Sequence, residues 1–579
     1  MKTQISRYSL ATAFFGLALG MGSLTSCSDF LDQPSEMAME ADEVFSDATS
    51  TEYYLQSLYT AWKENYRDEP AWYLLIGTDE IQIGTQQTRE SQGATEGAWD
   101  YNNGYLNAEN TYIQNMWNNR MQVAAKCGMA IKTIEEKADD ASDLTSLLGE
   151  LKFIRGFNNY QSAMLWGRIP ISDGSDDTSR RDLKTTWQAI IDDFKEASSE
   201  APETNDEGRA NKYAAYTMLG KAYMSAPEET GLRDYEKAAA AFKAVIDSKK
   251  YSLDPDYADL FAYDSKNFDQ EVIMCHTYSN ARGYANQIQF QLGSRASQNF
   301  FSDNCYFAGY DHAVPTTYAY KYKEDGGVWD RGDKRYDVSL RSDFSRECTQ
   351  ADFDNIMTKY STSVVELTPE EMNAHRAGIY EYMRDTDPTE IPVYVDKTNR
   401  IVYPNYMATL SWEGLGDDYD ELLPHIKKYE DYRTDDASGL SINNMWLSGK
   451  NVPVLRYSDV LLSYAECYMR LNQVGSDALA KYNLVRERAG LSDATSLTEE
   501  EIMDERMREL FGENWRRFDL IRTGKWETYM KARNKWTVRY AAEGKFVATN
   551  QLFPIPQTEL NQNTMMRTAD GNFDQNPGY

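Results

Sequence analysis

The sequence predicts a mainly α-helical fold, a scaffold of tetratricopeptide-type helix pairs that carries a long insertion of loops and short strands. Apolar residues recur at helical spacing through several consecutive segments. Residues 251–455 lack that spacing and scatter prolines, glycines and aromatic residues among short strand-like runs, at Glu271–His276, Val393–Val395 and Arg400–Tyr403. The chain of 579 residues is therefore expected to form one helical body with an irregular part.

The N-terminus has the parts of a bacterial signal peptide. Lys2 and Arg7 give a positive start, an apolar run follows to about Leu24, and small residues lead into Cys27. This order predicts a lipobox, with residues 1–26 removed and Cys27 acylated. Acyl chains at ~0.8 kcal/mol per buried CH₂ would hold the mature protein on a membrane. An ordinary signal peptide with a chance cysteine at the cleavage site is the alternative.

The mature chain is expected to consist of a lipidated tether, residues 27–43, and a single body, residues 44–579. Helical spacing begins near Val44 and is interrupted twice. The spacing predicts helices over residues 44–66, 109–250 and 456–531. Irregular structure is predicted over residues 67–107 and 251–455, which would hold the ligand site because loops commonly carry binding residues.

Two helix pairs carry the repeat signal. Leu219, Gly220 and Tyr223 stand at tetratricopeptide offsets in a helix predicted over 210–226. Its partner over 233–249 contains Ala238 and Phe242, a small residue and an aromatic that would fill the gap between the helices. A second pair is predicted over 457–472 and 476–489.

Charge and hydropathy restrict the partners. The formal charge is −31, and it becomes −33 when the signal peptide with Lys2 and Arg7 is removed. Such a field repels nucleic acid at long range, so no nucleic-acid partner is expected and uncharged ligands fit better. After Leu24 no apolar run reaches the ~18 residues of a membrane span. The lipid anchor is therefore the predicted attachment to the membrane.

Catalytic and cofactor motifs are absent from the sequence, so no enzyme activity is expected. It contains no GxSxG, HExxH, P-loop or GxGxxG pattern, and its four histidines do not fall at ligand spacing. A glycosidase pair of carboxylates remains an alternative that spacing cannot test. Asp173, Asp176 and Asp177 could hold a structural Ca²⁺ or form a solvated acidic turn. No cofactor is predicted, and a pairing of Cys275 with Cys305 stays open.

Aromatic residues are the clearest indication of a ligand. They make up 13% of the chain and are dense in two stretches outside helical spacing. Their flat faces with polar edges suit neutral sugars, and Arg89 beside two glutamines could donate to hydroxyls. Packing in the core or in a loop is the alternative for each ring. The candidate residues are Trp72, Arg89, Trp99 and Tyr101 in the first stretch and Tyr306, Tyr310 and Trp329 in the second.

Several motifs resemble one family. The mature start, Cys27–Asp32 with Pro34, is similar to that of SusD/RagB-type outer-membrane lipoproteins of Bacteroidetes. Further matches cover the C-terminal third and a central Asp-x-Arg segment. They are Asp333–Tyr336, Val454–Leu462, Arg486–Leu491, Arg516–Arg522 and Gln575–Tyr579.

The resemblance implies a surface glycan-binding lipoprotein that forms a lid on a SusC-like TonB-dependent transporter and delivers oligosaccharide to it. It also implies a ligand arc near Thr78–Glu80 and Tyr310–Asp311, which adds Asp79 and Asp311 to the candidates. A peptide-binding lid, a surface glycoside hydrolase and a structural scaffold are the alternatives. The charged residues of the C-terminal motifs are expected to pair with one another and join helices rather than touch ligand, since buried charges are usually paired. They are Arg456, Glu466, Arg486, Glu505, Arg506 and Glu509.

Overall fold

A computed structural model gives the fold. It describes residues 44–45, 47–67, 69–84, 106–137, 142–262, 265, 268–279, 284–293, 313–341, 346–347, 350–359, 364–368, 393–404, 425–430, 447–544 and 548–579. The signal peptide, Cys27 and the tether lie outside these residues. Among the described residues no helix is both long and apolar enough to cross a bilayer.

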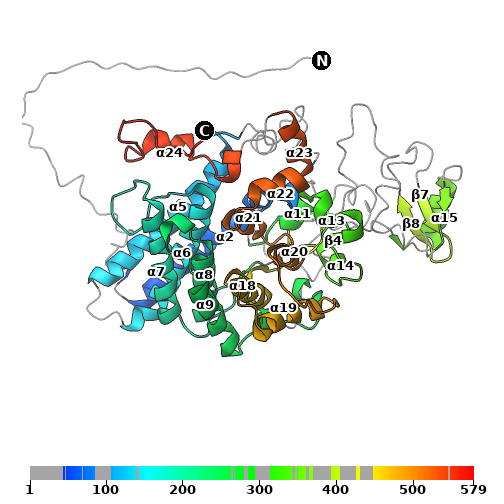
Figure 1. Cartoon of the computed structure of the whole chain (residues 1–579), viewed down its shortest axis with the longest axis horizontal. Coiled ribbons are helices and arrows are strands. Elements are labelled where there is room, and N and C mark those ends of the chain that lie inside the picture. Colours follow the sequence, from blue (N-terminus) through cyan, green and yellow to red (C-terminus); the bar gives the residue numbers. More distant parts are fainter. Residues whose placement is uncertain are drawn as a thin grey trace, which may run out of the picture.

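The body of the protein is an array of antiparallel helices, which confirms the mainly helical class (Figure 1). Helix α6 packs against both neighbours in the chain, α7 packs on α8, and α8 packs on α9. Helix α2 covers α5 and α6 at one end of the array. The helices are α2 (Ala48–Lys63), α5 (Thr111–Lys137), α6 (Thr145–Trp166), α7 (Leu183–Glu200), α8 (Lys212–Ser225) and α9 (Tyr235–Ser248).

The second predicted helix pair continues this array. Helix α18 (Tyr457–Arg470) packs on α9 and is followed by α19 (Ser476–Arg488) and α20 (Glu499–Glu509). Two predicted pairs that are far apart in sequence thus stack on each other. Beyond α20 the chain forms α21 (Arg516–Arg522), α22 (Trp526–Arg533), α23 (Lys535–Ala542) and α24 (Gln557–Gln562).

Local sequence explains where these helices begin and why one pair packs closely. Asp182 and Asn211 cap α7 and α8 by accepting from backbone N–H groups of the first turn. Thr498 and Glu501 form a capping box at the start of α20. Gly220 faces Phe242, and a Cβ there would lie 2.6 Å from the ring, so the close contact of α8 and α9 requires glycine.

Short strands join distant parts of the chain. Within the described residues, three two-stranded antiparallel sheets form. They pair β1 (Ile81–Ile83) with β3 (Ala313–Pro315), β2 (Val272–His276) with β10 (Val452–Arg456), and β4 (Leu340–Arg341) with β9 (His425–Ile426). A four-stranded sheet has the order β5-β8-β7-β6, from β5 (Arg346–Glu347), β8 (Ile401–Pro404), β7 (Val393–Asp396) and β6 (Val364–Glu366). Together with α15 (Gln350–Lys359) it lies to one side of the helical body (Figure 1).

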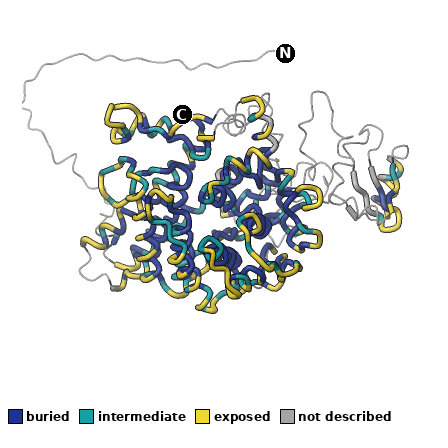
Figure 2. Tube along the Cα trace, viewed as in Figure 1, coloured by how far each residue is buried: buried dark blue, intermediate teal, exposed yellow. Residues whose placement is uncertain are grey.

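The buried residues form a continuous core that runs through the helical array into the β1–β3 region (Figure 2). Helix α3 (Glu69–Leu75) belongs to this core, although the segment was expected to be irregular. Its rings explain the difference. Tyr73 stacks on Tyr112 of α5 with centroids 4.8 Å apart, and Trp72 meets the same Tyr112 edge to face. Tertiary packing therefore makes a helix from a sequence with little helical periodicity.

Candidate functional site

The β1–β3 ribbon brings together two points of the chain next to which aromatic residues occur in the sequence. Ile83 at the end of β1 pairs with Ala313 at the start of β3, and the strands are antiparallel. Residues 85–105 follow β1 directly, and residues 294–312 precede β3. Since paired Cα atoms lie about 5 Å apart, both stretches are attached at the same end of this ribbon. The ribbon is therefore the base of a candidate ligand site.

The turn before β1 is fixed by hydrogen bonds from distant segments. Trp526 Nε1 donates to the carbonyl of Gly77 at 3.0 Å, and Asn534 Nδ2 donates to that of Thr78 at 2.9 Å. Thr316, directly after β3, donates its Oγ1–H to the Asp79 carbonyl and its backbone N–H to the Glu80 carbonyl. Helices α22 and α23 and strand β3 thus determine the position of β1.

Asp79 is the charged part of this attachment. Its carboxylate accepts two hydrogen bonds of 2.7 Å from Nε and Nη2 of Arg516, a bidentate pair, and lies 3.2 Å from Nη1 of Arg533. Asp79 is fully buried. Burial opposes the charged form of Arg516, but the Asp79 carboxylate more than compensates, and the pKa of the guanidinium is raised. We call the contacts of Gly77–Glu80 with α21–α23 and Thr316 the β1 anchor.

Glu80 contributes to the β1 anchor as a buried carboxyl group. Burial raises its pKa to about 8, although the Arg516 guanidinium opposes that shift. One carboxyl oxygen, Oε1, accepts from the backbone N–H of Gly512 at 3.2 Å. Glu80 is therefore mainly an uncharged acid at pH 7.

The structure corrects three of the predicted ligand residues. Trp72, Asp79 and Trp329 have no exposed surface, so none of them can contact a sugar in this conformation. Trp329 donates from Nε1 to the Ala319 carbonyl and meets Tyr336 edge to face, which makes it a core residue. Asp79 instead fixes the position of β1 through its pairs with Arg516 and Arg533. The other candidates lie outside the described residues: Arg89, Trp99, Tyr101, Tyr306, Tyr310 and Asp311.

Arg516 and Arg533 were not predicted to belong to this region. A signal for their role was present, because Thr78–Glu80 lies between the apolar runs Ala71–Ile76 and Ile81–Ile83. A carboxylate in such surroundings is buried and needs a cationic partner. Which of the many arginines supplies it depends on tertiary contacts across more than 400 residues, which local sequence does not specify.

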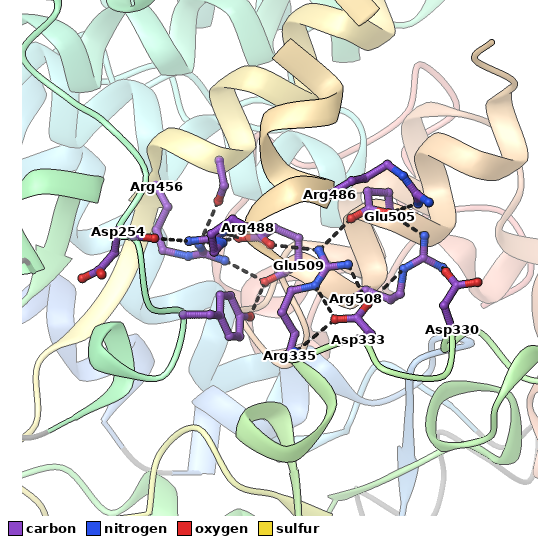
Figure 3. Close-up of polar contacts among 12 residues, drawn as sticks. Asp254, Asp330, Asp333, Arg335, Arg456, Arg486, Arg488, Glu505, Arg508 and Glu509 are labelled. Carbon is purple, nitrogen blue, oxygen red and sulfur yellow. Dashed lines mark hydrogen bonds and ion pairs between the residues drawn. The ribbon is translucent and has the colours of Figure 1, made fainter. Parts of the chain in front are cut away.

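The charged motif residues form a buried network (Figure 3). Arg335 pairs with Asp333 at 2.7 Å, Glu505 at 2.7 Å and Glu509 at 3.0 Å, and all of these side chains are fully buried. Arg456 pairs with Glu509 on its other side, at 2.8 Å. Burial would raise the pKa of Glu505, but Arg335 and Arg508 overcome that effect and lower it to about 2. The network holds strand β10 and the segment after β3 against α20.

A second cluster joins α18, α20 and α21. Arg506 lies 2.7 Å from Asp459 and 2.8 Å from Asp519, while Arg522 pairs with Glu466 at 2.6 Å. These pairs and those of the first network confirm the expectation that the motif charges join helices.

The acidic turn and the cysteine that were candidates for a metal site or a disulfide have other roles. Among the described residues, no group of three or more histidine, cysteine, aspartate or glutamate side chains could hold a metal ion. Asp173 and Asp177 accept from the backbone N–H groups of Ser175 and Ser179, as in an acidic turn. Cys275 is a free, buried thiol, so it does not pair with Cys305.

Comparisons with known proteins agree with this architecture. The sequence profile described as "SusD family" matches residues 248–579, and the one described as "Starch-binding associating with outer membrane" matches residues 29–224. The mainly helical scaffold with its short sheets is of SusD-like architecture. The chain belongs to the SusD family.

Relatives and solved structures resemble the chain over most of its length. "SusD-like protein P2" of Formosa agariphila is 24% identical over 589 aligned residues, 96% of this chain and 97% of the relative. "Starch-binding protein SusD" of Bacteroides thetaiotaomicron is 24% identical over 74% of this chain and 72% of its own. The solved "Laminarin binding SusD-like protein" has a TM-score of 0.66 at 20% identity, covering 92% of this chain and all of its own. "Surface glycan-binding protein A from Bacteroides thetaiotaomicron in complex with laminarihexaose" has a TM-score of 0.65 at 18% identity, covering 91% of this chain and 99% of its own.

Proposed function

We propose that this chain is a surface glycan-binding lipoprotein of the outer membrane, which captures oligosaccharide and passes it to a SusC-like TonB-dependent transporter. One observation carries the proposal. The register of Ile83 with Ala313 attaches residues 85–105, which contain Trp99 and two tyrosines, and residues 294–312, which contain two tyrosines and three phenylalanines, at one end of a rigid ribbon. Rings gathered there would offer flat apolar faces to uncharged sugar. Family members with laminarin, laminarihexaose and starch in their names support the ligand class.

Binding of neutral glycan is tested on the soluble chain 28–579. A glycan array identifies a ligand, and calorimetry then compares the wild type with Trp99→Ala and Tyr310→Ala. Loss of one aromatic contact should weaken affinity by about tenfold, at 0.5–1.5 kcal/mol per aromatic pair. Tyr53→Ala is the matched control, because Tyr53 is an exposed ring (68%) on helix α2. Unchanged affinity in both loop variants would refute the assigned site.

The glycan array and a matching screen of peptides separate the alternatives. Binding of peptides but not glycans would assign the chain to peptide capture. Release of shorter products from a bound oligosaccharide would indicate a hydrolase. No ligand in either screen would leave a structural scaffold as the best description.

Location and partner need separate measurements. Palmitate labelling of the full chain in a bacterial host should be lost in Cys27→Ala, with release of the protein from the membrane fraction. Affinity purification of the tagged, lipidated chain from its native membrane should recover a large TonB-dependent barrel. Recovery without that barrel would refute the transporter partnership and leave glycan binding untouched.

A further inference from the structure

A second open cleft lies away from the β1–β3 ribbon. Its walls are the loop 203–209, which lies between α7 and α8, and described residues of η6 (Asp259–Phe261) and α10 (Phe268–Glu271). Two hollows of about 280 and 250 Å³ adjoin, since Glu207 and Phe268 line both. Met274 and Cys275 of β2 line one hollow and Pro453 of β10 lines the other. Together the hollows fall in the size range of small-molecule sites.

The cleft combines aromatic faces with hydrogen-bond acceptors. Phe268, at the junction of the hollows, and Tyr251 are half-buried and line the open space. The exposed carboxylates of Asp206, Glu207 and Asp269 line the hollows beside these rings and can accept hydrogen bonds from hydroxyl groups. An apolar ring next to hydrogen-bonding groups matches the C–H face and hydroxyl edge of a pyranose.

Two cations that line the cleft are already paired, which disfavours an anionic ligand. Glu203 lies 3.3 Å from Nζ of Lys250, and Lys428 lies 2.8 Å from Glu513. An anionic ligand would find these cations compensated and would be repelled by the exposed carboxylates of Asp206 and Asp269, whereas an uncharged ligand would not.

The walls are held in place before any ligand arrives. Asn451 Nδ2 donates to Glu207 at 2.5 Å, and Asn451 Oδ1 accepts from the backbone N–H of Tyr278 at 3.0 Å. Gly208 has φ +83°, and a Cβ there would lie 2.6 Å from the Thr277 side chain. The loop that carries Glu207 is thus packed against the end of β2. A preformed cleft reduces the ordering cost of binding.

We propose that this cleft is a second binding site for neutral oligosaccharide, with Phe268 as its stacking ring. It rests on the proposed function and extends it. The cleft is separated from the ribbon by buried Tyr429, whose hydroxyl donates to the Gly512 carbonyl, while the Gly512 N–H donates to Glu80. Two sites on one chain would hold a polysaccharide at two points and raise its apparent affinity above that of either site.

The test uses the soluble chain 28–579 and a neutral hexasaccharide that the array has identified, with laminarihexaose and maltohexaose as first probes. Hydrogen–deuterium exchange with and without sugar is followed in the Trp99→Ala/Tyr310→Ala double variant, which isolates the cleft. Sugar should protect peptides 203–211 and 268–275 in that variant. Adding Phe268→Ala or Glu207→Ala should abolish the protection and reduce retention on the parent polysaccharide by about tenfold. Tyr53→Ala is the control.

The outcomes separate this proposal from the one before it. Protection at the cleft that Phe268→Ala and Glu207→Ala both remove supports the second site, even if the Trp99→Ala/Tyr310→Ala double variant binds glycan as tightly as the wild type. Binding that the double variant abolishes completely, with wild-type retention in both cleft variants, overturns the second site and leaves the proposed function standing. A wild-type chain that binds no glycan overturns both.

Discussion

Asp79→Ala should destabilise the protein although its side chain never reaches the surface. Removal of the carboxylate leaves Arg516 buried, with the Met503 carbonyl as its remaining acceptor. It also removes one of the three carboxylates around Arg533, the others being Asp504 and Glu500. Breaking a buried pair by removing one partner typically costs about 3–5 kcal/mol. At roughly 2 °C per kcal/mol for a chain larger than 150 residues, Tm should fall by about 6–10 °C.

The matched control removes a surface partner of Arg533, which also contacts Asp79. Glu500 pairs with Arg533 at 3.3 Å but is 71% exposed. Exposed pairs contribute about 0–1 kcal/mol, so Glu500→Gln should move Tm by 2 °C or less. Asp79→Asn should fall between the two variants, because the amide keeps one acceptor oxygen and loses the charge.

Differential scanning calorimetry gives the stabilities, and calorimetric titration at 20 °C gives glycan affinity on the folded fraction. Since Asp79 positions β1 and touches no ligand, Asp79→Asn should weaken glycan binding, whereas Glu500→Gln should not. Equal Tm values for Asp79→Ala and Glu500→Gln would refute the β1 anchor as described.

Three further outcomes follow from the buried residues. Burial raises the folded-state pKa of Glu80 to about 8, so the stability that the protonated carboxyl contributes is present at pH 4 and is lost as the pH rises through 8. The Tm of Glu80→Gln relative to wild type should therefore increase between pH 5 and pH 9. A constant difference in Tm would contradict the raised pKa. Trp329→Ala should cost about 3–5 kcal/mol in urea unfolding while the glycan Kd of the folded protein stays within twofold; a selective loss of affinity would return Trp329 to the ligand site. Gly220→Ala should cost about 1–3 kcal/mol by pressing on Phe242, whereas Gly475→Ala, with no atom within 4 Å of its Cβ, should cost less; equal losses would argue against the close helix contact.

Most of the scaffold could be predicted because its information is local. The helices α7 and α9 carry amphipathic spacing, and α7, α8 and α9 each begin at a capping residue; both signals act within a few residues. The pairing of the motif charges followed from a similar rule, since arginine and glutamate among apolar neighbours need partners. Their particular partners were not predictable. Arg456 meets Glu271 across 185 residues, and no periodicity reports such a contact.

The candidate site was harder to predict for a physical reason. A tryptophan outside helical spacing has the same sequence appearance whether it packs in the core or faces solvent, and both Trp72 and Trp329 proved to be buried. Strands β1 and β3 have three residues each, which is too short for alternation to identify them. The pairing of Ile83 with Ala313 is a contact across 230 residues, which only the fold supplies.

Strand β1 and the segment after β3 are each fixed to a C-terminal helix. Strand β1 is held by Asp79 and Arg516 of α21, and the segment after β3 is held by Arg335, which pairs with Glu505 and Glu509 of α20. Pairs of this kind tolerate little change, because removing one partner leaves an uncompensated buried charge. Substitutions at these buried positions are therefore expected to displace the ribbon, whereas the exposed pair of Arg533 with Glu500 should tolerate change.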